Sequence, residues 1–405
     1  MSNYTFSNGI APMTGSATRN IFSLLTRPEI ISFAGGNPAR DCLPTKEIGE
    51  CTAEVFADDA TAKRCLQYGA TEGIPELREE IIRLAKDTGI VANGDGSPIA
   101  HNNVQILSGG SQGLDLLLKA FCNPGDVVLV EDPTFLGFLA TVQSYAAKAI
   151  GVKMEDDGFD LADLEDKIKK HQPKLLYVIS AFSNPTGKTH SAAKRKAAAE
   201  LAGRYGVVVA EDDPYGKLRY SGTAVPAMKS FDTADCVVYL SSFSKTISPG
   251  MRCGFAIGQA DIIRKMAIGK QGTDLHTSNL SMMAIAKYLQ KGYFYPNIEK
   301  SIPIYRQRKD AMVAALQKYM PEEFQFNNPE GGLFIWGEFI GKGSKINTAE
   351  VFPKAIERNV AYIQGSVFYA DGSGPNTLRL NFSNESPERI DQGIKALGEL
   401  FKEEL

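Results

Sequence analysis

Short runs of β-branched residues alternate with helical patterns over the middle of the chain, and this alternation constrains the fold more than any other feature. Between about Val104 and Ile257 the runs are VQIL, VVLV, LLYVI, VVVAE, VVYL and CGFAI, and helical patterns begin near Ser111, Thr134 and Ala192. Such alternation predicts a mostly parallel sheet with helices on both faces. Ligands of α/β proteins bind outside the carboxyl ends of the strands, so functional residues are expected there.

After about Asp261 the pattern becomes mainly helical. A long helix is predicted from roughly Tyr293 to Met320, and the strands GGLFIWGEF and TLRLNFS then enclose one helix before a closing helix from Pro387. We expect this part of the chain to form a smaller α+β domain.

The first forty or so residues contain a predicted helix capped by Thr14 or Ser16, followed by the extended segment ISFAGGNP. This stretch is too short to form a domain alone, and we expect it to pack beside the C-terminal part. The predicted organisation is therefore an N-terminal segment over 1–45, a large domain over 46–295 and a small C-terminal domain over 296–405.

The composition is that of a globular protein: the chain has 405 residues, of which 43% are hydrophobic and 22% charged. The net charge of -3 is spread without basic blocks, so neither nucleic acid nor a membrane is expected as a partner. No apolar run approaches the about 18 residues that span a bilayer, and the N-terminus does not resemble a signal peptide, which predicts a cytoplasmic location. The six cysteines lack CxxC spacing, so no metal site is predicted.

A glycine-rich turn, SGGSQG, follows the first strand and opens a helix at Ser111. Backbone N–H groups at a helix N-terminus, with the Ser111 hydroxyl, are typical of a phosphate site. The pattern Ser108-x-Gly110-x-x-Gly113 also resembles a dinucleotide fingerprint, with Glu131 as the ribose carboxylate, and this would indicate a nicotinamide dehydrogenase. Because the first glycine of that fingerprint is missing, the dehydrogenase stays a minor alternative.

Three more polar clusters follow apolar strands, namely FSNPTG at 182–187, EDDPY at 211–215 and SSFSKTISPGMR at 241–252. One ligand explains all four clusters, because it combines a phosphate, a protonated ring nitrogen, a ring oxygen and an aldehyde. That ligand is pyridoxal 5′-phosphate (PLP). The matching side chains are Ser111, Ser242, Ser244 and Arg252 for the phosphate, Asp212 for the nitrogen, Asn184 and Tyr215 for the oxygen, and Lys245 for the aldehyde.

In combination, the motifs NPTG, DxxY and SxSK, followed by Arg252 and by Arg379 in TLRLNFS, resemble the fold-type I, class I/II aminotransferases over nearly the whole chain. The stretches EDDPY, SFSK and LQYGATEGIPELR are most similar to the branch that holds 2-aminoadipate, kynurenine and aromatic aminotransferases. The resemblance implies an α/β fold of the PLP-dependent transferase type I, with a mostly parallel seven-stranded sheet in the large domain and a smaller α+β domain.

The resemblance also implies roles for individual residues. Lys245 would form the Schiff base with the cofactor and shuttle the proton, and Asp212 would keep the ring nitrogen protonated. Tyr215 and Asn184 would bind the ring oxygen, and Asn184 would also contact the substrate. The phosphate cup would comprise Gly110, Ser111, Gln112, Ser242, Ser244 and Arg252.

Five further positions follow from the same resemblance. Arg379 and Gly36 would bind the α-carboxylate of the substrate, and Tyr68 would reach the phosphate of the other subunit, which implies a homodimer. Phe135 stands where relatives often stack Tyr or Trp on the ring. Arg19 resembles an N-terminal arginine that reads substrate side chains in some relatives, although a solvated helix arginine also fits.

The predicted function is a ping-pong aminotransferase that moves an α-amino group to a 2-oxo acid, with glutamate and 2-oxoglutarate as one pair. The second pair stays open. A PLP-dependent lyase or decarboxylase could use the same core residues. A PLP-binding effector domain of a transcription regulator is the third possibility, but such regulators carry an N-terminal helix-turn-helix domain, for which the early position of Gly36 leaves little room.

Overall fold

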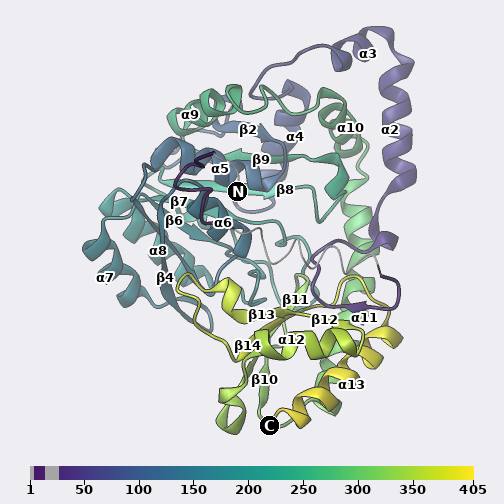
Figure 1. Cartoon of the computed structure of the whole chain (residues 1–405). Helices are drawn as coiled ribbons and strands as arrows, with labels where there is room; N and C mark the ends of the chain where they lie inside the picture. The colour runs from purple at the N-terminus through teal and green to yellow at the C-terminus, as the bar shows by residue number, and fades with distance from the viewer. Residues whose placement is uncertain (1–3, 14–26) are drawn as a thin grey trace.

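The computed structural model describes residues 4–13 and 27–405. A large sheet with helices on both faces occupies one part of the molecule, and a smaller sheet with two helices lies below it in Figure 1. The long helix α11 (Phe294–Tyr319) runs between the two parts. This arrangement confirms the α/β class and the additional smaller domain.

The described residues of the large sheet form eight strands in the order β2-β9-β8-β7-β6-β3-β4-β5. The five strands from β8 to β4 run parallel, whereas β9 is antiparallel to both of its neighbours. The strands are β2 (Val104–Leu107), β3 (Val127–Asp132), β4 (Lys148–Glu155), β5 (Gly158–Phe159), β6 (Leu175–Val178), β7 (Val208–Asp212), β8 (Val237–Ser242) and β9 (Gly254–Ile257).

Seven of these strands, all except β5, form the mostly parallel sheet that was predicted. The eighth is β5, a two-residue strand that folds back on the end of β4 as an antiparallel edge. Two residues carry no periodic signal, so hydrophobic patterning could not reveal this strand.

Helices lie on both faces of the large sheet in Figure 1, whereas α2 and α3 stand apart from the sheet and pack on α10. Helix α8 starts at Ala192, as predicted, because the Ser191 side chain accepts the Lys194 N–H and caps it. The bounds of these helices are α2 (Thr45–Ala57), α3 (Asp59–Leu66), α4 (Pro75–Lys86), α5 (Gly110–Phe121), α6 (Leu136–Ser144), α7 (Leu161–His171), α8 (Ala192–Tyr205), α9 (Ala260–Gln271) and α10 (Asn279–Gln290).

Strand β4 and helix α7 are absent from the predicted pattern. Strand β4 is only partly buried, and Val152 is its one fully buried residue, so it lacks the continuous apolar run of its neighbours. Helix α7 is capped by Asp160 and buries only Leu164 and Ile168. The hydrophobic pattern was therefore weak for both elements.

The smaller part contains an antiparallel sheet of order β10-β11-β14-β13, covered by α12 and α13. A two-stranded parallel pair, β1 with β12, joins the beginning of the chain to it through Ile31 and Ser32. The bounds are β1 (Ile31–Ser32), β10 (Phe324–Phe326), β11 (Phe334–Phe339), α12 (Thr348–Glu357), β12 (Val360–Ala361), β13 (Ile363–Gln364), β14 (Thr377–Asn381) and α13 (Pro387–Glu403).

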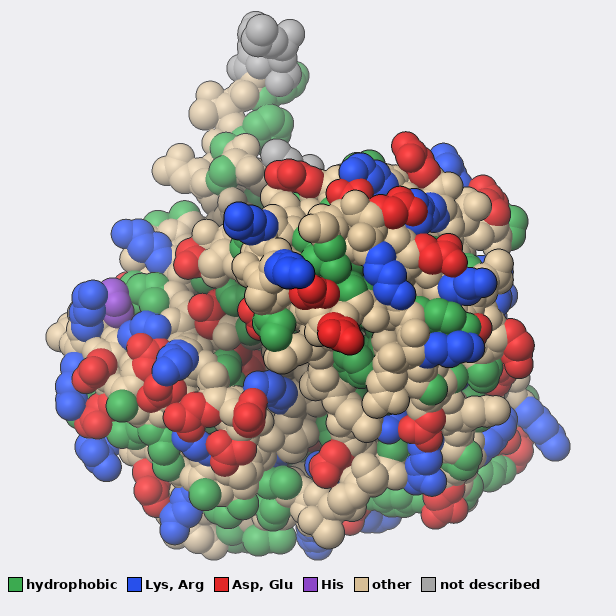
Figure 2. Space-filling model, turned by 90° about the horizontal axis from the view of Figure 1, so that it is seen from below, with side chains coloured by type: hydrophobic (Ala, Val, Ile, Leu, Met, Phe, Trp, Pro, Cys, Tyr) green, Lys and Arg blue, Asp and Glu red, His purple; other side chains and the backbone are tan. Residues whose placement is uncertain are grey.

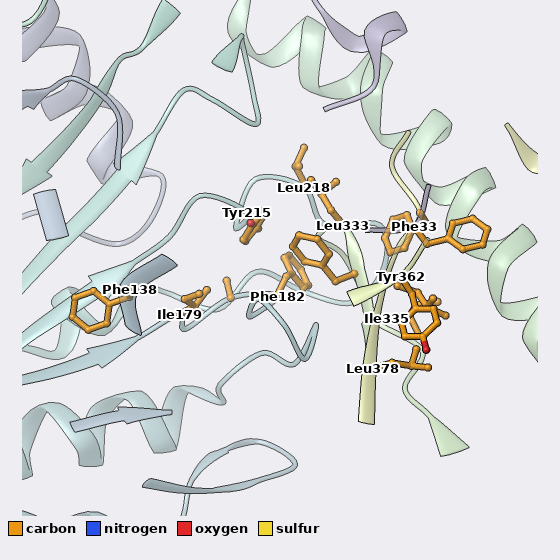
Figure 3. Packing of buried hydrophobic residues seen from close by; sticks show 14 of the residues in the cluster. Phe33, Phe138, Ile179, Phe182, Tyr215, Leu218, Leu333, Ile335, Tyr362 and Leu378 are labelled. Carbon is orange, nitrogen blue, oxygen red and sulfur yellow. The ribbon is translucent and has the colours of Figure 1, made fainter. Parts of the chain in front are cut away.

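One apolar core runs from the large sheet into the smaller part. In Figure 3 its side chains extend from Phe138 and Ile179 in the large part to Tyr362 and Leu378 in the smaller part. The capped helix predicted around Thr14 lies outside the described residues. None of the described helices is long and apolar enough to cross a membrane.

The face seen in Figure 2 shows acidic and basic side chains interspersed rather than gathered by sign. This distribution agrees with the small net charge of -3. The view shows no basic stripe of the kind that follows a nucleic-acid backbone.

Two helical glycines should respond in opposite ways to alanine. A Cβ on Gly113 in α5 would lie 2.8 Å from Leu107 Cδ1 and 2.9 Å from Leu240 Cδ2, whereas a Cβ on Gly49 in α2 meets nothing within 4 Å. We expect Gly113→Ala to lower the free energy of unfolding by about 1–3 kcal/mol through overpacking. Gly49→Ala should raise it by about 0.5–1 kcal/mol. Urea denaturation measures both, and equal shifts would contradict the packing argument.

Candidate active site

A cavity of about 320 Å³ lies at the carboxyl ends of the parallel strands, bounded on one side by the segment 34–37 and by β11 and β14. Its position is the one expected for a ligand site in an α/β sheet. Twelve of the predicted site residues line it: Gly36, Gly110, Ser111, Phe135, Asn184, Asp212, Tyr215, Ser242, Ser244, Lys245, Arg252 and Arg379.

Lys245 enters the cavity from the turn that follows β8. Its Nζ donates a hydrogen bond to the carbonyl oxygen of Gly36 at 2.7 Å. Burial, together with the nearby charges of Arg379 and Arg252, lowers the pKa of Lys245 to about 8. The amine is therefore partly uncharged near neutral pH, which is the form that attacks a carbonyl carbon.

Arg379 projects from β14 and is only 4% exposed. Its guanidinium donates to Asn184 Oδ1 at 2.8 Å and to the carbonyl oxygens of Ala34 and Gly35, at 2.6 and 3.0 Å, and stacks 4.3 Å from the Phe334 ring centroid. Its Nε has no partner among the described residues. Burial lowers the pKa of Arg379 to about 10.

No carboxylate of the described residues pairs with Arg379 or Lys245, although both cations face the same cavity. Buried charges in folded proteins are normally paired. This part of the cavity therefore favours an anionic ligand, and a guanidinium presents the planar fork that fits a carboxylate.

Asp212 stands at the end of β7 and is 8% exposed. Burial raises the pKa of Asp212 to about 7, although the Tyr177 hydroxyl, which donates to Oδ2 at 3.0 Å, acts in the opposite direction. The nearby charges of Asp213 and Glu131 add to the increase. A cationic ligand group beside Asp212 would restore the ionised carboxylate.

The glycine-rich turn before α5 forms one end of the cavity. Gly109 has a φ of 96°, and a Cβ there would collide with the Arg252 guanidinium. Arg252 Nη2 in turn donates to the Ser108 carbonyl at 3.0 Å. The Ser242 hydroxyl donates to Ser244 Oγ at 2.8 Å. A helix N-terminus, two hydroxyls and an arginine together form a phosphate-binding arrangement.

Aromatic side chains form much of the wall in the middle of the cavity. Tyr215 is 5% exposed, and its ring lies edge-on to Phe334 with the centroids 5.7 Å apart. Burial raises the pKa of Tyr215 well above its ordinary value, so its hydroxyl remains a hydrogen-bond donor. Phe135 supplies a flat apolar face.

These residues fit PLP. The arrangement supplies hydroxyls and an arginine for a phosphate, a buried acid without a cationic partner among the described residues for a ring nitrogen, and an amine of lowered pKa for an aldehyde. The second buried cation, Arg379, lines the same cavity and leaves it a place for a further anionic group.

A sequence model of the family described as aminotransferase class I and II matches residues 29–397. The chain belongs to this family. It is a transaminase of fold type I, and its cofactor is pyridoxal phosphate.

Three relatives illustrate the similarity. Aromatic-amino-acid aminotransferase 1 of Thermococcus litoralis is 37% identical over 405 residues, covering 99% of this chain and 94% of the relative. The crystal structure of Pyrococcus horikoshii kynurenine aminotransferase in complex with PMP has a TM-score of 0.91 and 38% identity, covering 99% and 97% of the two chains. LysN, the alpha-aminoadipate aminotransferase of Thermus thermophilus, complexed with N-(5'-phosphopyridoxyl)-L-leucine, has a TM-score of 0.87 and 32% identity, covering 98% and 97%.

Two of the predicted site residues that the structure describes, Gln112 and Tyr68, do not line the cavity of this aminotransferase. The Gln112 side chain points away from it, because its Oε1 accepts the Ser108 N–H at 2.8 Å and its Nε2 donates to Asp274 at 2.8 Å. Tyr68 is 80% exposed and lies edge-on to His276. Arg19 lies outside the described residues.

Sequence reasoning missed several residues of the site. Tyr177, the hydrogen-bond donor to Asp212, was hidden in the apolar run LLYVI, where its hydroxyl was the only polar signal. Phe334, which stacks on Arg379, was read only as part of a strand. The remaining additions to the cavity wall are Ala34, Gly35, Asn37, Leu114, Leu136, Ile179, Pro214 and Pro249.

Glu131 does not take the place that the dehydrogenase alternative required. It is 1% exposed, and its carboxylate faces inward to His190, Ile179 and Ser183. A ribose could not reach it, so this position gives the alternative no support.

The raised pKa of Asp212 predicts a pH effect in the cofactor-free protein. Because the folded-state pKa is about 7 and the ordinary value is 3.8, stability is lost as the pH rises from about 4 to about 7. Asp212→Asn removes this loss, so the variant should gain stability relative to the unmodified chain across that window, by a few kcal/mol at most. Urea denaturation at a series of pH values measures the difference.

The control is Asp59→Asn, which removes an exposed carboxylate that pairs with Lys63 on α3. Its stability difference from the unmodified chain should change little over the same window. Parallel curves for Asp212→Asn and the unmodified chain would contradict the assignment of Asp212 as an unpaired buried acid.

Proposed function

We propose that this transaminase works by a ping-pong mechanism, in which an amino acid leaves as a 2-oxo acid before a second 2-oxo acid enters, with glutamate and 2-oxoglutarate as one pair. The observation that carries the proposal is the pair of cations in one cavity, Lys245 with its lowered pKa and the buried Arg379 without a carboxylate partner among the described residues. The uncharged amine of Lys245 can react with a carbonyl group, and the guanidinium of Arg379 can bind a carboxylate.

PLP, when bound, supplies an electron sink for negative charge that develops at the substrate α-carbon. Asp212 would hold the positive charge on the ring nitrogen, and its burial favours a charged partner. Tyr215 and Asn184 would hydrogen-bond the ring oxygen, and Phe135 would lie against the ring face.

Lys245 would carry the cofactor through its Nζ and then, as a free amine, move the proton at the substrate α-carbon. A pKa of about 8 suits both tasks, because a general base works best when its pKa is close to the working pH. Its present partner is the Gly36 carbonyl, a neutral acceptor that does not hold the ammonium as a carboxylate would.

Arg379 would bind the substrate carboxylate through the N–H groups that Ala34, Gly35 and Asn184 leave free, among them Nε–H, which has no partner among the described residues. The phosphate would lie in the cup formed by the N-terminus of α5 with Ser242, Ser244 and Arg252, where the α5 dipole and the guanidinium both favour an anion.

We also propose a homodimer in the cytoplasm. Large apolar side chains stand exposed on and beside α2 and α3, where Phe56 is 47%, Leu66 73% and Tyr68 80% exposed. Contact with a second copy would bury them and would let Tyr68 approach the partner's phosphate. All six cysteines are free, as is usual in a reducing compartment.

The decisive experiment mixes the PLP-loaded protein with glutamate and no 2-oxo acid acceptor. We expect the visible absorption of the bound cofactor to bleach once, with about one 2-oxoglutarate released per subunit and no ammonia. Lys245→Ala should show neither change, because it lacks the amine that moves the proton. Repeated ammonia release without an acceptor would indicate a lyase, and carbon dioxide release a decarboxylase.

The same assay, run with aromatic amino acids, kynurenine and 2-aminoadipate, identifies the second pair. These are the substrates that the names of the relatives indicate. A cofactor spectrum that no member of the panel alters would contradict the transamination proposal.

Arg379 offers a separate test of substrate binding. Arg379→Ala should lower kcat/KM by the equivalent of about 2–5 kcal/mol, because the substrate carboxylate would lose a buried charged partner. Arg379→Lys should recover only part of this loss, since an ammonium lacks the planar fork. Steady-state kinetics give the values, and an unchanged kcat/KM in the alanine variant would remove Arg379 from the substrate site.

A further inference from the structure

Glu131 is a buried carboxylate that the proposed function does not use. It lies next to the end of β3 and is 1% exposed. Its Oε1 is 2.8 Å from His190 Nε2, and its Oε2 accepts the Ile179 N–H at 3.0 Å and the Ser183 hydroxyl at 3.2 Å. Both carboxylate oxygens are therefore occupied.

All three partners of Glu131 belong to a single loop, residues 179–190, which connects β6 with α8. Ile179 and His190 stand at the two ends of the loop, and Ser183 lies in its middle. The carboxylate thus joins three separate points of one segment, and these hydrogen bonds reach no other element among the described residues.

The same loop carries side chains into the cavity. Asn184, directly after Ser183, accepts the hydrogen bond from Arg379 Nη1 at 2.8 Å, and Ile179 forms part of the cavity wall. Glu131 therefore binds the residue next to the one that orients Arg379, but it does not itself line the cavity.

Arg195 of α8 also forms hydrogen bonds with the backbone of the loop 179–190. Its guanidinium, 2% exposed, donates to the carbonyl oxygens of Ser180 at 2.6 Å and His190 at 3.0 Å. The Ser180 hydroxyl also donates to Glu211 Oε1 at 2.6 Å. The loop is thus held by buried charged groups, whose hydrogen bonds are stronger and more directional than those between neutral groups.

We propose that Glu131 is a positioning residue of the active site: its carboxylate fixes the loop 179–190 so that Asn184 is held against Arg379. The KM part of this inference rests on the proposed function, whereas the conformation of the loop does not. A carboxylate suits the position because one of its oxygens accepts from the Ile179 N–H and the Ser183 hydroxyl, while the other oxygen lies 2.8 Å from His190 Nε2.

The test replaces the carboxylate by its amide in Glu131→Gln. The amide keeps the shape but replaces one accepting oxygen by an NH2 donor, so the contacts with Ile179, Ser183 and His190 cannot all be kept without a change of orientation or tautomer. We expect backbone amides of residues 179–190 to exchange hydrogen about tenfold faster in the PLP-loaded protein, as followed by mass spectrometry. KM for the amino donor should rise about tenfold, with a smaller change in kcat, because Arg379 is misplaced.

The matched control is Asp232→Asn, which makes the same chemical change at another buried carboxylate. Asp232 accepts the Val237 N–H at 2.9 Å and pairs with Lys229 at 3.0 Å, and its hydrogen bonds involve no residue of the loop. This variant should lower the melting temperature but leave loop exchange and KM unchanged. If Glu131→Gln behaves in the same way, Glu131 is only a structural residue and the inference fails.

Ser183→Ala decides the question if Glu131→Gln does not fold. It removes one donor to Glu131 without any change of charge, so faster exchange confined to residues 179–190 is expected, with a smaller amplitude. Unchanged exchange in this variant would overturn the inference. If the unmodified enzyme transaminates no amino acid, the proposed function fails. The hydrogen-exchange measurements still test the role of Glu131, because they do not depend on activity.

Discussion

The buried guanidinium of Arg379 sets the arrangement of the whole site. It stands on β14 of the smaller sheet, yet its hydrogen bonds go to Asn184 of the large part and to the backbone of Ala34 and Gly35. Three segments that are far apart in the sequence therefore meet around one side chain. Carbonyl and amide oxygens satisfy its hydrogen bonds but do not neutralise its charge, which leaves the cavity suited to an anion.

Burial also shifts the pKa values of two further groups in the site, Lys245 and Asp212. Lys245 shares the cavity with Arg379, so its proton is held weakly, whereas Asp212 has no cation nearby among the described residues and holds its proton strongly. Without a ligand each group is displaced toward its neutral form. A single cofactor that brings an aldehyde, a cationic ring and a phosphate would relieve both groups and would fill the cup beside Arg252.

Local patterns were sufficient to predict the polar clusters at the strand ends and the α/β class. The strand VVYL and the turn that carries Lys245 are contiguous in the chain, so patterning placed the lysine at the sheet edge. The direction of the Gln112 side chain could not be predicted, because its partner Asp274 comes from a distant helix end. For the same reason the sequence did not reveal that Tyr177 donates to Asp212, and the half-exposed strand β4 lacked an apolar run.

The pairing of β1 with β12 has a consequence for protein engineering. Because Ile31 and Ser32 pair with a strand of the smaller part, the backbone of Ala34 and Gly35 is anchored to the same body as Arg379. A chimera that takes its C-terminal part from another family member would therefore separate these groups unless residues 27–37 came from the same parent. The functional module of this enzyme is discontinuous in the gene, and a crossover placed by chain order alone would divide it.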